Sequence, residues 1–566
     1  MEEKPKNDRS KNGRTKKEKD KLKIIALGGL NEIGKNITVF EYGNDIIVVD
    51  CGLGFPDDDM YGIDIVIPDF SYLIANRNRV KGIVLTHGHE DHIGAMPYLL
   101  REMKATVYAT PLTAGLLEGK LNEHSVADNA NLIVKEAGDS FQLGCFTVEM
   151  IHVNHSIPDT VALAIKTPVG TVIVTSDFKI DTTPVSGGMI DIVRFGEFGK
   201  KGVLALLADS TNIEKKGYSP SEGTVGERLD ELFHACTQRI IVTTFASNVH
   251  RLQQVLNCAA KYGRRVAVTG RSMENSLRVS TELGCVKIPD GLVMEVNQVK
   301  SLPPEKTVII TTGSQGEPMS ALYRMAFSGH RQIEIQRGDR VIISASAVPG
   351  NEKTVNRVID ELFRRGAEVK YDKASELHVS GHAYQEELRM MLALIKPKFF
   401  IPVHGDHRHL YAHAKLAASV GVDQNNIVIA DNGQVIELNG RKINKNGTVP
   451  SGKVFVDGTA VASVVVRDRQ HLAQNGMIVV IANISSEDGS IVTGPDIVTR
   501  GFIYVKESEE LMNELKEVVM QTLEPYTTSR VMDRSALRSS IKSDLSSYLY
   551  KKTRRNPMIM SVITEV

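Results

Sequence analysis

Short apolar runs alternate with amphipathic stretches along most of this chain of 566 residues. The runs "KIIALGG", "DIIVVDCG", "KGIVLT" and "TVIVTSD" are rich in β-branched residues, and Gly, Asn or Asp separates them from the segments that follow. Apolar runs of this kind, separated by helix-like segments, are typical of α/β proteins whose sheets are covered by helices. We therefore expect an α/β fold.

Several of these apolar runs end on a polar residue that can bind a metal ion. Asp50 closes "IIVVD", His87 follows "GIVLT", Asp177 follows "TVIVTS" and His404 follows "KFFIPV". Strand ends hold the backbone rigidly, and the loops beyond them can point side chains at a common centre. We expect these side chains to converge on one site.

The segment "THGHEDHIG" carries the densest group of such residues, namely His87, His89, Glu90, Asp91 and His92. A protein interior does not accept five polar groups unless something compensates for their desolvation. Imidazole and carboxylate ligands without thiolates suit zinc, manganese or a similar divalent ion. A shared carboxylate can also hold two ions about 3.5 to 4 Å apart. The segment therefore predicts a metal site.

The overall charge and the cysteines narrow the class of protein. The 68 basic residues balance the 68 acidic ones, so no global field favours a nucleic acid or a membrane, while a local basic groove stays open. The cysteines are five, scattered and never spaced as Cys-x-x-Cys. This favours a reducing compartment with free, mostly buried thiols over a thiolate zinc site.

The N-terminal residues 1–22 contain no apolar core of a secretory signal, and no later stretch approaches the ~20 apolar residues of a membrane span. We expect a cytoplasmic protein without a membrane partner. The tail has nothing to bury, so we expect it to be disordered. It serves either as a solubilising tail or as a weak electrostatic tether for RNA or another partner.

Further motifs follow the histidine-rich segment in a fixed order. They are "HSIPD" from His155, "SDFKID" around Asp177, "ADSTN" around Asp209, "FASNVHR", "GRSMENS", "TTGSQGEPMSAL", "HVSGHA" from His378 and "IPVHGD". Together with the pattern His-x-His-x-Asp-His, this series resembles the ribonuclease J family, in the β-CASP branch of the metallo-β-lactamase superfamily. The resemblance covers nearly the whole chain after the tail, including "GPDIVTRGF" and "KKTRRNPMI".

The resemblance implies an α/β fold: a metallo-β-lactamase αββα sandwich with an inserted β-CASP α/β domain and a small C-terminal α/β domain. The insert contains four strand-like runs, "QRIIVTTFA", "RRVAVTG", "KTVIITTG" and "DRVIISAS". Near the C-terminus, "SVVVRDRQHLAQNGMIVVIANI" predicts strand, helix and strand, and "KESEELMNELKEVVMQTLEP" predicts an amphipathic helix. We expect a disordered tail (1–22), a first lactamase part (23–216), the β-CASP domain (217–375), a second lactamase part (376–450), a linker (451–462) and a C-terminal oligomerisation domain (463–566).

The resemblance also implies the ligands of two divalent metal ions. One ion is held by His87, His89 and His155, the other by Asp91, His92 and His404, and Asp177 bridges them. Zinc is the first choice, with manganese or magnesium as alternatives, and Asp50 would orient a ligand. The family further suggests a structural calcium site, although an exposed acidic loop explains the oxygen-rich run "FPDDDMYGID" equally well. Its residues would be Gly62, Asp64 and Asp457.

Two other groups of residues are implied to act on RNA. Asp209 and His382 would complete the catalytic chemistry at the leaving oxygen. A second group would contact the RNA backbone and cradle a 5′ phosphate: Ser247, Asn248, His378, Val379, Ser380, Gly381 and His382. A pocket for one terminal phosphate can place the first linkage at the metals, which favours removal of nucleotides from the 5′ end.

This chain departs from the family pattern at two places. Ala383 and Tyr384 follow "HVSGH" where a smaller pair is common, so the pocket rim is expected to be tighter or more aromatic, and the tyrosine can stack on a base. His407 and His409 lie beside His404, and we expect them at the surface or in contact with ligands rather than on further metals.

The reaction implied is attack on the phosphodiester by a hydroxide held between two metal ions, leaving a 5′ phosphate and a 3′ hydroxyl. The resemblance suggests a 5′-to-3′ exonuclease that favours 5′-monophosphorylated RNA and also acts as an endonuclease, in RNA maturation, rRNA processing and mRNA decay. The implied partners are single-stranded RNA, further copies in a homodimer or homotetramer, and a paralogous subunit, RNA helicase or ribosome.

Two alternatives belong to other classes. A small-molecule hydrolase would share the metals but has no use for the long insert. A non-catalytic RNA-binding subunit of a ribonuclease complex stays open, although the complete ligand set argues against it.

Overall fold

The computed structural model of the chain describes residues 21–57, 60–348, 351–371, 377–458, 460–461, 465–485, 490–502, 509–526 and 534–566. Contacts within the chain divide it into two units. The larger unit comprises Met1–Phe55 and Val66–Lys453, and the smaller one Pro56–Ile65 and Val454–Val566. The tail that was expected to be disordered, residues 1–22, lies almost entirely outside the described residues.

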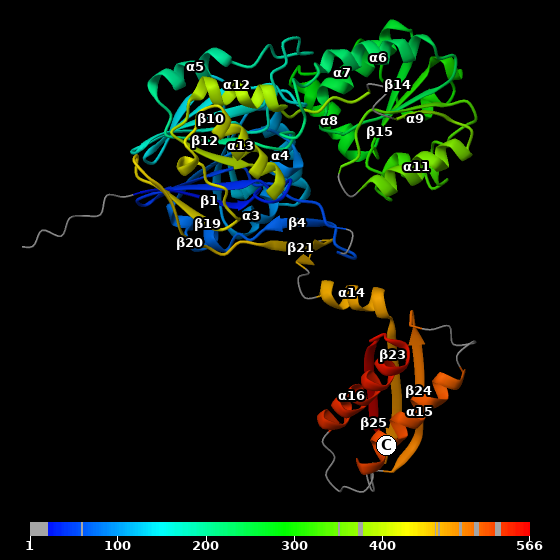
Figure 1. Cartoon of the computed structure of the whole chain (residues 1–566). Helices are drawn as coiled ribbons and strands as arrows, with labels where there is room; N and C mark the ends of the chain where they lie inside the picture. The colour runs from blue at the N-terminus through cyan, green and yellow to red at the C-terminus, as the bar shows by residue number, and fades with distance from the viewer. Residues whose placement is uncertain are drawn as a thin grey trace, which may run out of the picture. The chain divides into compact units, whose positions relative to one another are not determined.

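Two mainly buried β-sheets form the centre of the larger unit (Figure 1). The first is described in the order β20 (Ile443–Thr448), β19 (Gln434–Leu438), β1 (Leu22–Gly28), β2 (Ile37–Tyr42), β3 (Asp45–Val49), β5 (Val80–Val84), β6 (Ala105–Ala109) and β7 (Ala130–Val134). The second has the order β18 (Phe399–Val403), β12 (Ala205–Asp209), β11 (Gly170–Val174), β10 (Val161–Thr167), β9 (Phe146–His152) and β8 (Ser140–Leu143).

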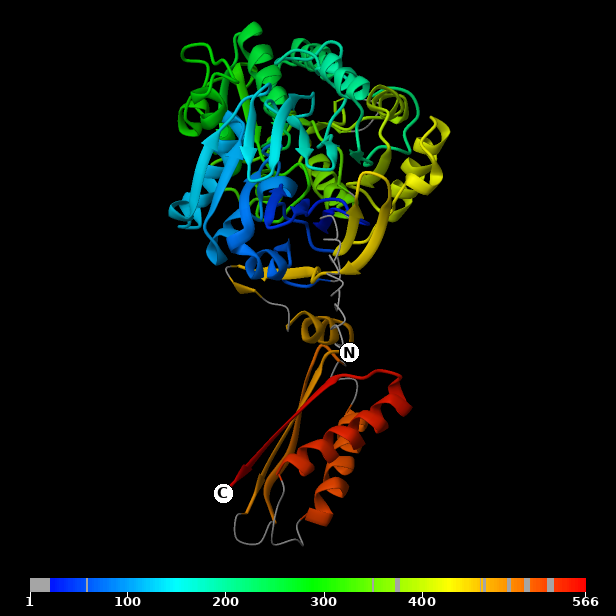
Figure 2. The same ribbon diagram turned by 90° about the vertical axis from the view of Figure 1, so that its left-hand side faces the viewer.

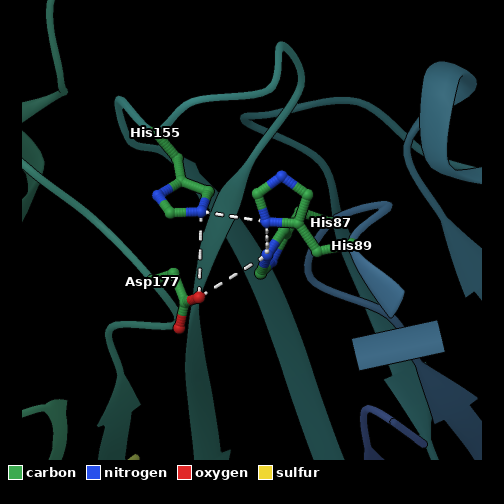
Figure 3. Close-up of side chains that lie close together, drawn as sticks. All are labelled: His87, His89, His155 and Asp177. Carbon is green, nitrogen blue, oxygen red and sulfur yellow. Dashed lines mark hydrogen bonds and ion pairs between the residues drawn. The ribbon is translucent and has the colours of Figure 1, made fainter. Parts of the chain in front are cut away.

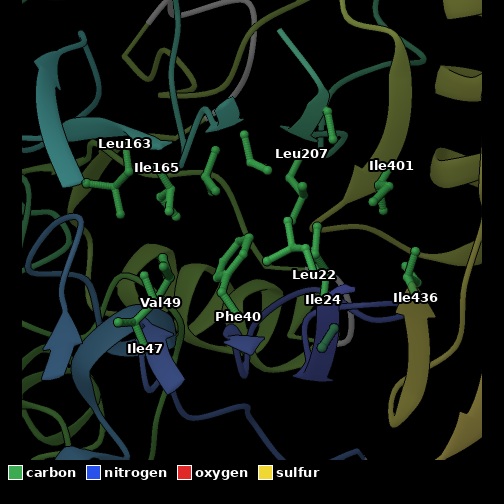
Figure 4. Close-up of a cluster of buried hydrophobic side chains, with 14 of the residues drawn as sticks. Leu22, Ile24, Phe40, Ile47, Val49, Leu163, Ile165, Leu207, Ile401 and Ile436 are labelled. Carbon is green, nitrogen blue, oxygen red and sulfur yellow. The ribbon is translucent and has the colours of Figure 1, made fainter. Parts of the chain in front are cut away.

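The inner faces of these sheets pack against each other in one hydrophobic cluster. Figure 4 shows Leu22, Ile24 and Phe40 from the first sheet opposite side chains of the second, among them Leu163 and Leu207. Alternate residues of each strand point inward because side chains alternate across a strand. Burying one such side chain contributes about 1.5–3 kcal/mol, so this cluster stabilises the scaffold on which the strand ends are fixed.

Helices cover the outer faces of both sheets and complete four layers. The second sheet carries α5 (Ile192–Lys201), α12 (Gln385–Ile395) and α13 (His407–Ser419), whose apolar side chains form a separate cluster with it. The first sheet has α4 (Pro111–Glu123) beside β6 and β7, and α3 (Met96–Glu102) packs against α4. The shorter elements of this unit are α1 (Ser71–Ala75), α2 (Glu90–Ile93), η1 (Arg77–Arg79), η2 (Ala127–Asn129) and η5 (Gln424–Asn426).

The insert between β12 and β18 forms its own parallel sheet, shown in green in Figure 1. The sheet order is β14 (Arg265–Thr269), β15 (Thr307–Thr311), β13 (Ile240–Thr243), β16 (Arg340–Ile343) and β17 (Glu368–Lys370). The four runs predicted as strands form β13 to β16, so that prediction is confirmed. The helical elements of the insert are α6 (Glu222–His234), α7 (Val249–Lys261), α8 (Arg271–Glu282), α9 (Val296–Val299), η3 (Pro304–Lys306), α10 (Ala321–Ala326) and α11 (Glu352–Arg364).

The smaller unit contains a three-stranded sheet in the order β24 (Ile491–Arg500), β23 (Met477–Ile484) and β25 (Met558–Glu565). Helices α15 (Glu509–Leu523) and α16 (Arg534–Thr553) pack on one face of it (Figure 2). The amphipathic helix predicted here is α15. The other elements are β21 (Lys453–Asp457), β22 (Ala460–Val461), α14 (Val465–Asn475) and η7 (Glu524–Tyr526), and β4 (Ile65–Pro68) lies at the boundary of the units.

One strand prediction in this unit is wrong. The run "SVVV" was expected to be a strand, but Val465 and Val466 begin helix α14, and residues 462–464 lie outside the described ones. The polar residues that follow the two valines form a helix, and the valines belong to its first turn despite their preference for strands.

Two observations concern the whole described chain. All five cysteines are free and three of them are buried, as expected. Among the described residues, we find no helix whose length and hydropathy would suit a bilayer span.

Candidate active site

The seven side chains predicted as metal ligands lie at strand ends and in the loops or short helix that follow. His87 and His89 follow β5, Asp91 and His92 lie on α2, His155 follows β9, Asp177 follows β11 and His404 follows β18. Their donor atoms gather in overlapping groups, and the atoms of each group lie within 4.8 Å of one another. The structure thus brings all seven together, as strand ends facing one edge of the two sheets would predict.

The first group consists of His87, His89, His155 and Asp177 (Figure 3). The Nδ1 atom of His89 lies 3.1 Å from Nε2 of His87 and 3.1 Å from Nε2 of His155. Asp177 Oδ2 lies 3.7 Å from Nε2 of His87 and 3.8 Å from Nε2 of His155. Ligands around a tetrahedral zinc ion stand about 3.3 Å apart, so this donor set fits such an ion.

The second group consists of Asp91, His92, Asp177 and His404. Asp177 Oδ2 lies 3.3 Å from Nε2 of His92, and Asp91 Oδ2 lies 3.3 Å from Nε2 of His404. That nitrogen of His404 is buried and makes no hydrogen bond within the described part of the chain. A buried nitrogen that lies beside the Asp91 carboxylate without a hydrogen bond fits a cation ligand, and Asp177 is the residue common to both groups.

A third group adds His382 and Asp209 to Asp177 and His404. His382 Nδ1 donates a hydrogen bond to Asp209 Oδ2 over 2.8 Å and lies 3.9 Å from Asp177 Oδ2. The two residues predicted as catalytic are therefore paired with each other directly beside the predicted ligands.

Asp50 is hydrogen-bonded to one of the predicted ligands, His92. Its carboxylate accepts hydrogen bonds from the backbone N and the hydroxyl of Thr86 at 2.8 and 2.9 Å, and from Nδ1 of His92 at 2.8 Å. The bond to Nδ1 leaves Nε2 of His92 to face the cluster. Such partners fix the orientation and tautomer of a ligating imidazole.

Replacing Asp50 by asparagine is expected to lower the affinity for divalent metal about 10- to 100-fold, because the amide offers one acceptor where three donors converge. The dissociation constant is measured by competition with a chromophoric chelator, and circular dichroism checks that the fold is retained. Affinity equal to that of the wild type in a folded variant would show that His92 needs no support from Asp50.

Three residues beside the cluster adopt left-handed backbone conformations without being glycine. They are Asp50 with φ 61°, Ser176 with φ 56° and His404 with φ 55°. This conformation costs an L-residue about 1–2 kcal/mol, and it persists where the surrounding structure imposes it. The local strain turns the chain sharply at each strand end so that the polar side chains converge.

Burial and charge set the protonation of the cluster. Burial lowers the pKa of His87 and His155 well below the usual value and that of His89 to about 4, so these imidazoles are neutral at pH 7. Burial opposes protonation of His92 and His404 as well, but nearby carboxylates, chiefly Asp177, outweigh it and raise the pKa of both. Neutral imidazole is the form that binds metal, and a divalent cation would take the place of the remaining protons.

The segment "HVSGH" lies against this cluster. His155 Nδ1 donates to the carbonyl of Gly381 over 2.7 Å, and a Cβ atom at Gly381 would lie 2.5 Å from that nitrogen, so glycine is required there. Asn212 Nδ2 donates to Ser380 Oγ over 2.6 Å and to the His382 carbonyl over 3.2 Å. The segment is thus fastened to the residues that surround the predicted metals.

The other predicted RNA contacts lie next to this segment. The rings of Phe245 and His378 are 6.5 Å apart, which brings "FASN" beside "HVSGH". Ser247 is partly exposed, whereas Asn248 is buried and its Oδ1 caps α7 by accepting the backbone N–H of Arg251 over 3.1 Å. Burial lowers the pKa of His378 to about 3, and its Nδ1 has no hydrogen bond among the described residues.

The structure contradicts the expectation for the pocket rim at Ala383, while the stacking of Tyr384 on a base stays a prediction. Ala383 is only 1% exposed and packs in the core cluster of α12, so it cannot line a rim. Tyr384 is partly exposed, and Lys215 Nζ lies 5.1 Å from the centre of its ring. His407 is exposed, and His409 is buried as part of the capping of α13, so neither joins the clusters found among the described residues.

The residues predicted to bind calcium lie in the smaller unit beside an arginine. Arg469 Nη1 donates to the Gly62 carbonyl over 2.9 Å, and its Nη2 pairs with the Asp457 carboxylate. Asp64 Oδ2 accepts the backbone N–H of Gly458 over 2.7 Å. The calcium site stays a prediction, and Arg469 places a positive charge beside two of the residues expected to form it.

Sequence reasoning missed three residues that contact the predicted ligands. Asn36 Nδ2 lies 3.1 Å from Nε2 of His92, Thr211 Oγ1 lies 3.1 Å from Nδ1 of His404, and Ser176 Oγ lies 3.3 Å from Nδ1 of His87. Ser176 and Thr211 stand within motifs that were recognised. Asn36 follows "GGLNEIGK", whose glycines signal a tight turn but no chemistry.

Comparison with protein families gives the site its context. The family models that match are "Ribonuclease J, beta-CASP domain" over residues 237–362, "Ribonuclease J C-terminal domain" over 464–566, "Metallo-beta-lactamase superfamily" over 30–181 and "Zn-dependent metallo-hydrolase RNA specificity domain" over 366–429. Ribonuclease J2 of Bacillus subtilis is 41% identical over 554 residues, which cover 97% of this chain and 100% of the relative. The chain belongs to the ribonuclease J family.

Other relatives agree over similar lengths. Ribonuclease J of Thermus thermophilus is 42% identical, and the match covers 96% of this chain and 96% of the relative. Ribonuclease J of Synechocystis is also 42% identical, and the match covers 96% of this chain and 86% of the relative. A solved protein of unknown function from Enterococcus faecalis matches 74% of this chain and all of its own with a TM-score of 0.52 at 17% identity, which supports the fold alone. The expected metallo-β-lactamase fold with β-CASP and C-terminal domains is confirmed.

Proposed function

We propose that this protein is a 5′-to-3′ exonuclease on single-stranded RNA that favours a 5′ monophosphate and also cuts internally. Membership of the ribonuclease J family makes it a metal-dependent ribonuclease. The observation that carries the finer proposal is the hydrogen bond of 2.7 Å between His155 and Gly381, because it joins the segment expected to cradle a phosphate to a predicted metal ligand. A terminus held there would leave its first linkage beside the clustered donors.

The buried histidines and aspartates support binding of divalent metal, and we propose two ions, with zinc preferred to manganese or magnesium. His87, His89 and His155 would hold one, Asp91, His92 and His404 the other, and Asp177 both. When bound, such ions supply a water of lowered pKa and neutralise charge on the phosphodiester.

His382 and Asp209 are proposed to act at the leaving 3′ oxygen. Asp209 accepts a hydrogen bond from Nδ1 of His382. The other ring nitrogen, Nε2, is not part of this bond. Burial opposes protonation of His382, but Asp209 and Asp177 outweigh it and raise its pKa. The imidazole can therefore carry a proton or a positive charge next to an oxygen that becomes negative.

The proposed setting is RNA maturation, rRNA processing and mRNA decay in the cytoplasm. The boundaries proposed from the sequence place an oligomerisation domain at 463–566, which suits a homodimer or homotetramer. A paralogous subunit, an RNA helicase or the ribosome are proposed as further partners.

A single digestion experiment tests the proposal. One RNA labelled at its 5′ nucleotide is prepared with a 5′ monophosphate, triphosphate or hydroxyl, and incubated with metal-replete wild type or His87→Ala. We expect labelled mononucleotide, released fastest from the monophosphate and absent with the variant. Internal fragments alone, whatever the 5′ group, would refute the exonuclease proposal, and no metal-dependent cleavage would favour a non-catalytic subunit.

A further inference from the structure

Arg251 on helix α7 is fully buried and is among the largest such side chains in the described part of the chain. A guanidinium carries five N–H donors, and burying it is costly unless those donors find acceptors. Besides Gln254 on the same helix, the acceptors of Arg251 come from three segments that are far apart in the sequence. This pattern indicates a residue that joins segments rather than one that fills space.

The contacts of Arg251 converge on Glu222, Ser344 and Leu377. Nε and Nη2 donate to Glu222 Oε1 over 3.0 and 2.6 Å. Nη1 donates to the carbonyls of Leu377 and Ser344 over 2.7 and 3.1 Å and also contacts the Ser344 hydroxyl. That hydroxyl donates to the same Leu377 carbonyl over 2.7 Å.

These contacts tie together the two places where the chain passes between the lactamase sandwich and the insert. Glu222 begins α6, which lies beside α7 in the insert (Figure 1), and its backbone N donates over 2.9 Å to Asp181, four residues after the ligand Asp177. Leu377 directly precedes His378. One arginine therefore fixes the entry to the insert and the start of the "HVSGH" segment.

The two ends of this segment are held by different residues. Its C-terminal end is fastened to Asn212, His155 and Asp209, all next to the predicted metals. Its N-terminal end is held by Arg251 and Ser344, which belong to the insert. A change at Arg251 should thus displace His378 and Val379 while His382 keeps its own bonds.

We infer that Arg251 is a positioning residue that sets where residues 377–379 lie and thereby governs recognition of the RNA 5′ end. This inference rests on the proposed function, in which His378 to His382 receive the 5′ phosphate. Binding of the end depends on Arg251, whereas the chemistry at the metals does not.

The test compares Arg251→Lys with Arg340→Lys. A lysine has a single ammonium and cannot reach Glu222 and Leu377 together as the guanidinium does. Arg340 is a matched control because it is also buried in the insert. It donates hydrogen bonds of 2.7 Å to Glu368 and to the Leu232 carbonyl. Among the described residues, it makes no hydrogen bond to Leu377.

For Arg251→Lys, we expect KM for 5′-monophosphorylated RNA to rise about tenfold, and the preference over 5′-hydroxyl RNA to fall by a similar factor. Hydrolysis of bis(p-nitrophenyl) phosphate, which has no 5′ end to place, should stay within about twofold of wild type. Arg340→Lys should leave the preference for the monophosphate unchanged. Equal losses on RNA and on the small diester would overturn the inference.

Hydrogen exchange gives a readout that does not depend on activity. The amides of His378 and Val379 should exchange faster in Arg251→Lys than in wild type or Arg340→Lys, and unchanged exchange at these two residues would overturn the inference. If Arg251→Lys does not fold, Ser344→Ala removes one of the two donors to Leu377 and should raise KM about threefold. If the wild type cleaves no RNA, the proposed function is refuted. The hydrogen-exchange measurement would still test whether Arg251 positions residues 377–379.

Discussion

Asp177→Asn is expected to lower RNA cleavage about 1,000-fold or more, because this carboxylate is the residue shared by all three groups of donors. Asp177 Oδ2 lies 3.3 Å from Nε2 of His92, and Oδ1 lies 3.1 Å from Nδ1 of His404. An amide is neutral and has one acceptor oxygen, so it cannot neutralise and join two cations. The variant should retain fewer metal ions per chain than wild type, measured by mass spectrometry of the metals after dialysis.

Asp191→Asn is the matched control for this substitution. Asp191 is exposed and caps α5 by accepting the backbone N–H of Arg194 over 2.9 Å, a role that asparagine also fills. It should keep the metal content and the activity of the wild type. Full metal content and activity in Asp177→Asn would rule out a bridging role for Asp177.

Strand positions and the clustered side chains could be predicted because both depend on local sequence. Runs such as "DIIVVD" combine β-branched residues with a polar residue at the end. This pattern predicts a strand and places the polar side chain at the end of that strand. His87 to His92 stand out since no core accepts so many polar groups in one turn. The structure brings these side chains together with His155, which only the resemblance to the ribonuclease J family implied.

The residues that hold the site in place could not be predicted, because their partners are remote in the sequence. The bond between Arg251 and Leu377 spans 126 residues, and that between Asn212 and Ser380 spans 168. Arg251 ends the motif "FASNVHR", but that motif does not show which remote groups the side chain reaches. Ala383 was misplaced for the same reason, since its burial follows from how α12 packs and not from its neighbours in the sequence.

His382→Ala is expected to lower kcat for RNA about 100- to 10,000-fold, the range typical of a lost general acid or charge stabiliser. The metal content should stay that of the wild type, because His382 Nδ1 is already bonded to Asp209 over 2.8 Å and lies 3.9 Å from Asp177. This outcome separates a catalytic histidine from a ligand: loss of metal in His382→Ala would make His382 a ligand of the third group of donors instead. His407→Ala, at an exposed histidine beside His404, is the matched control and should behave as wild type.

Asp209→Asn decides whether the aspartate acts through His382. If Asp209 serves to orient and charge the imidazole, Asp209→Asn should lower kcat, and the double variant with His382→Ala should lose no more than His382→Ala alone, because residues that act as one unit are not additive. Losses that multiply would mean that Asp209 acts independently, most directly through His404, whose Nδ1 lies 3.3 Å from Asp209 Oδ1. The metal content of Asp209→Asn separates these two routes, since only the route through His404 reaches a predicted ligand.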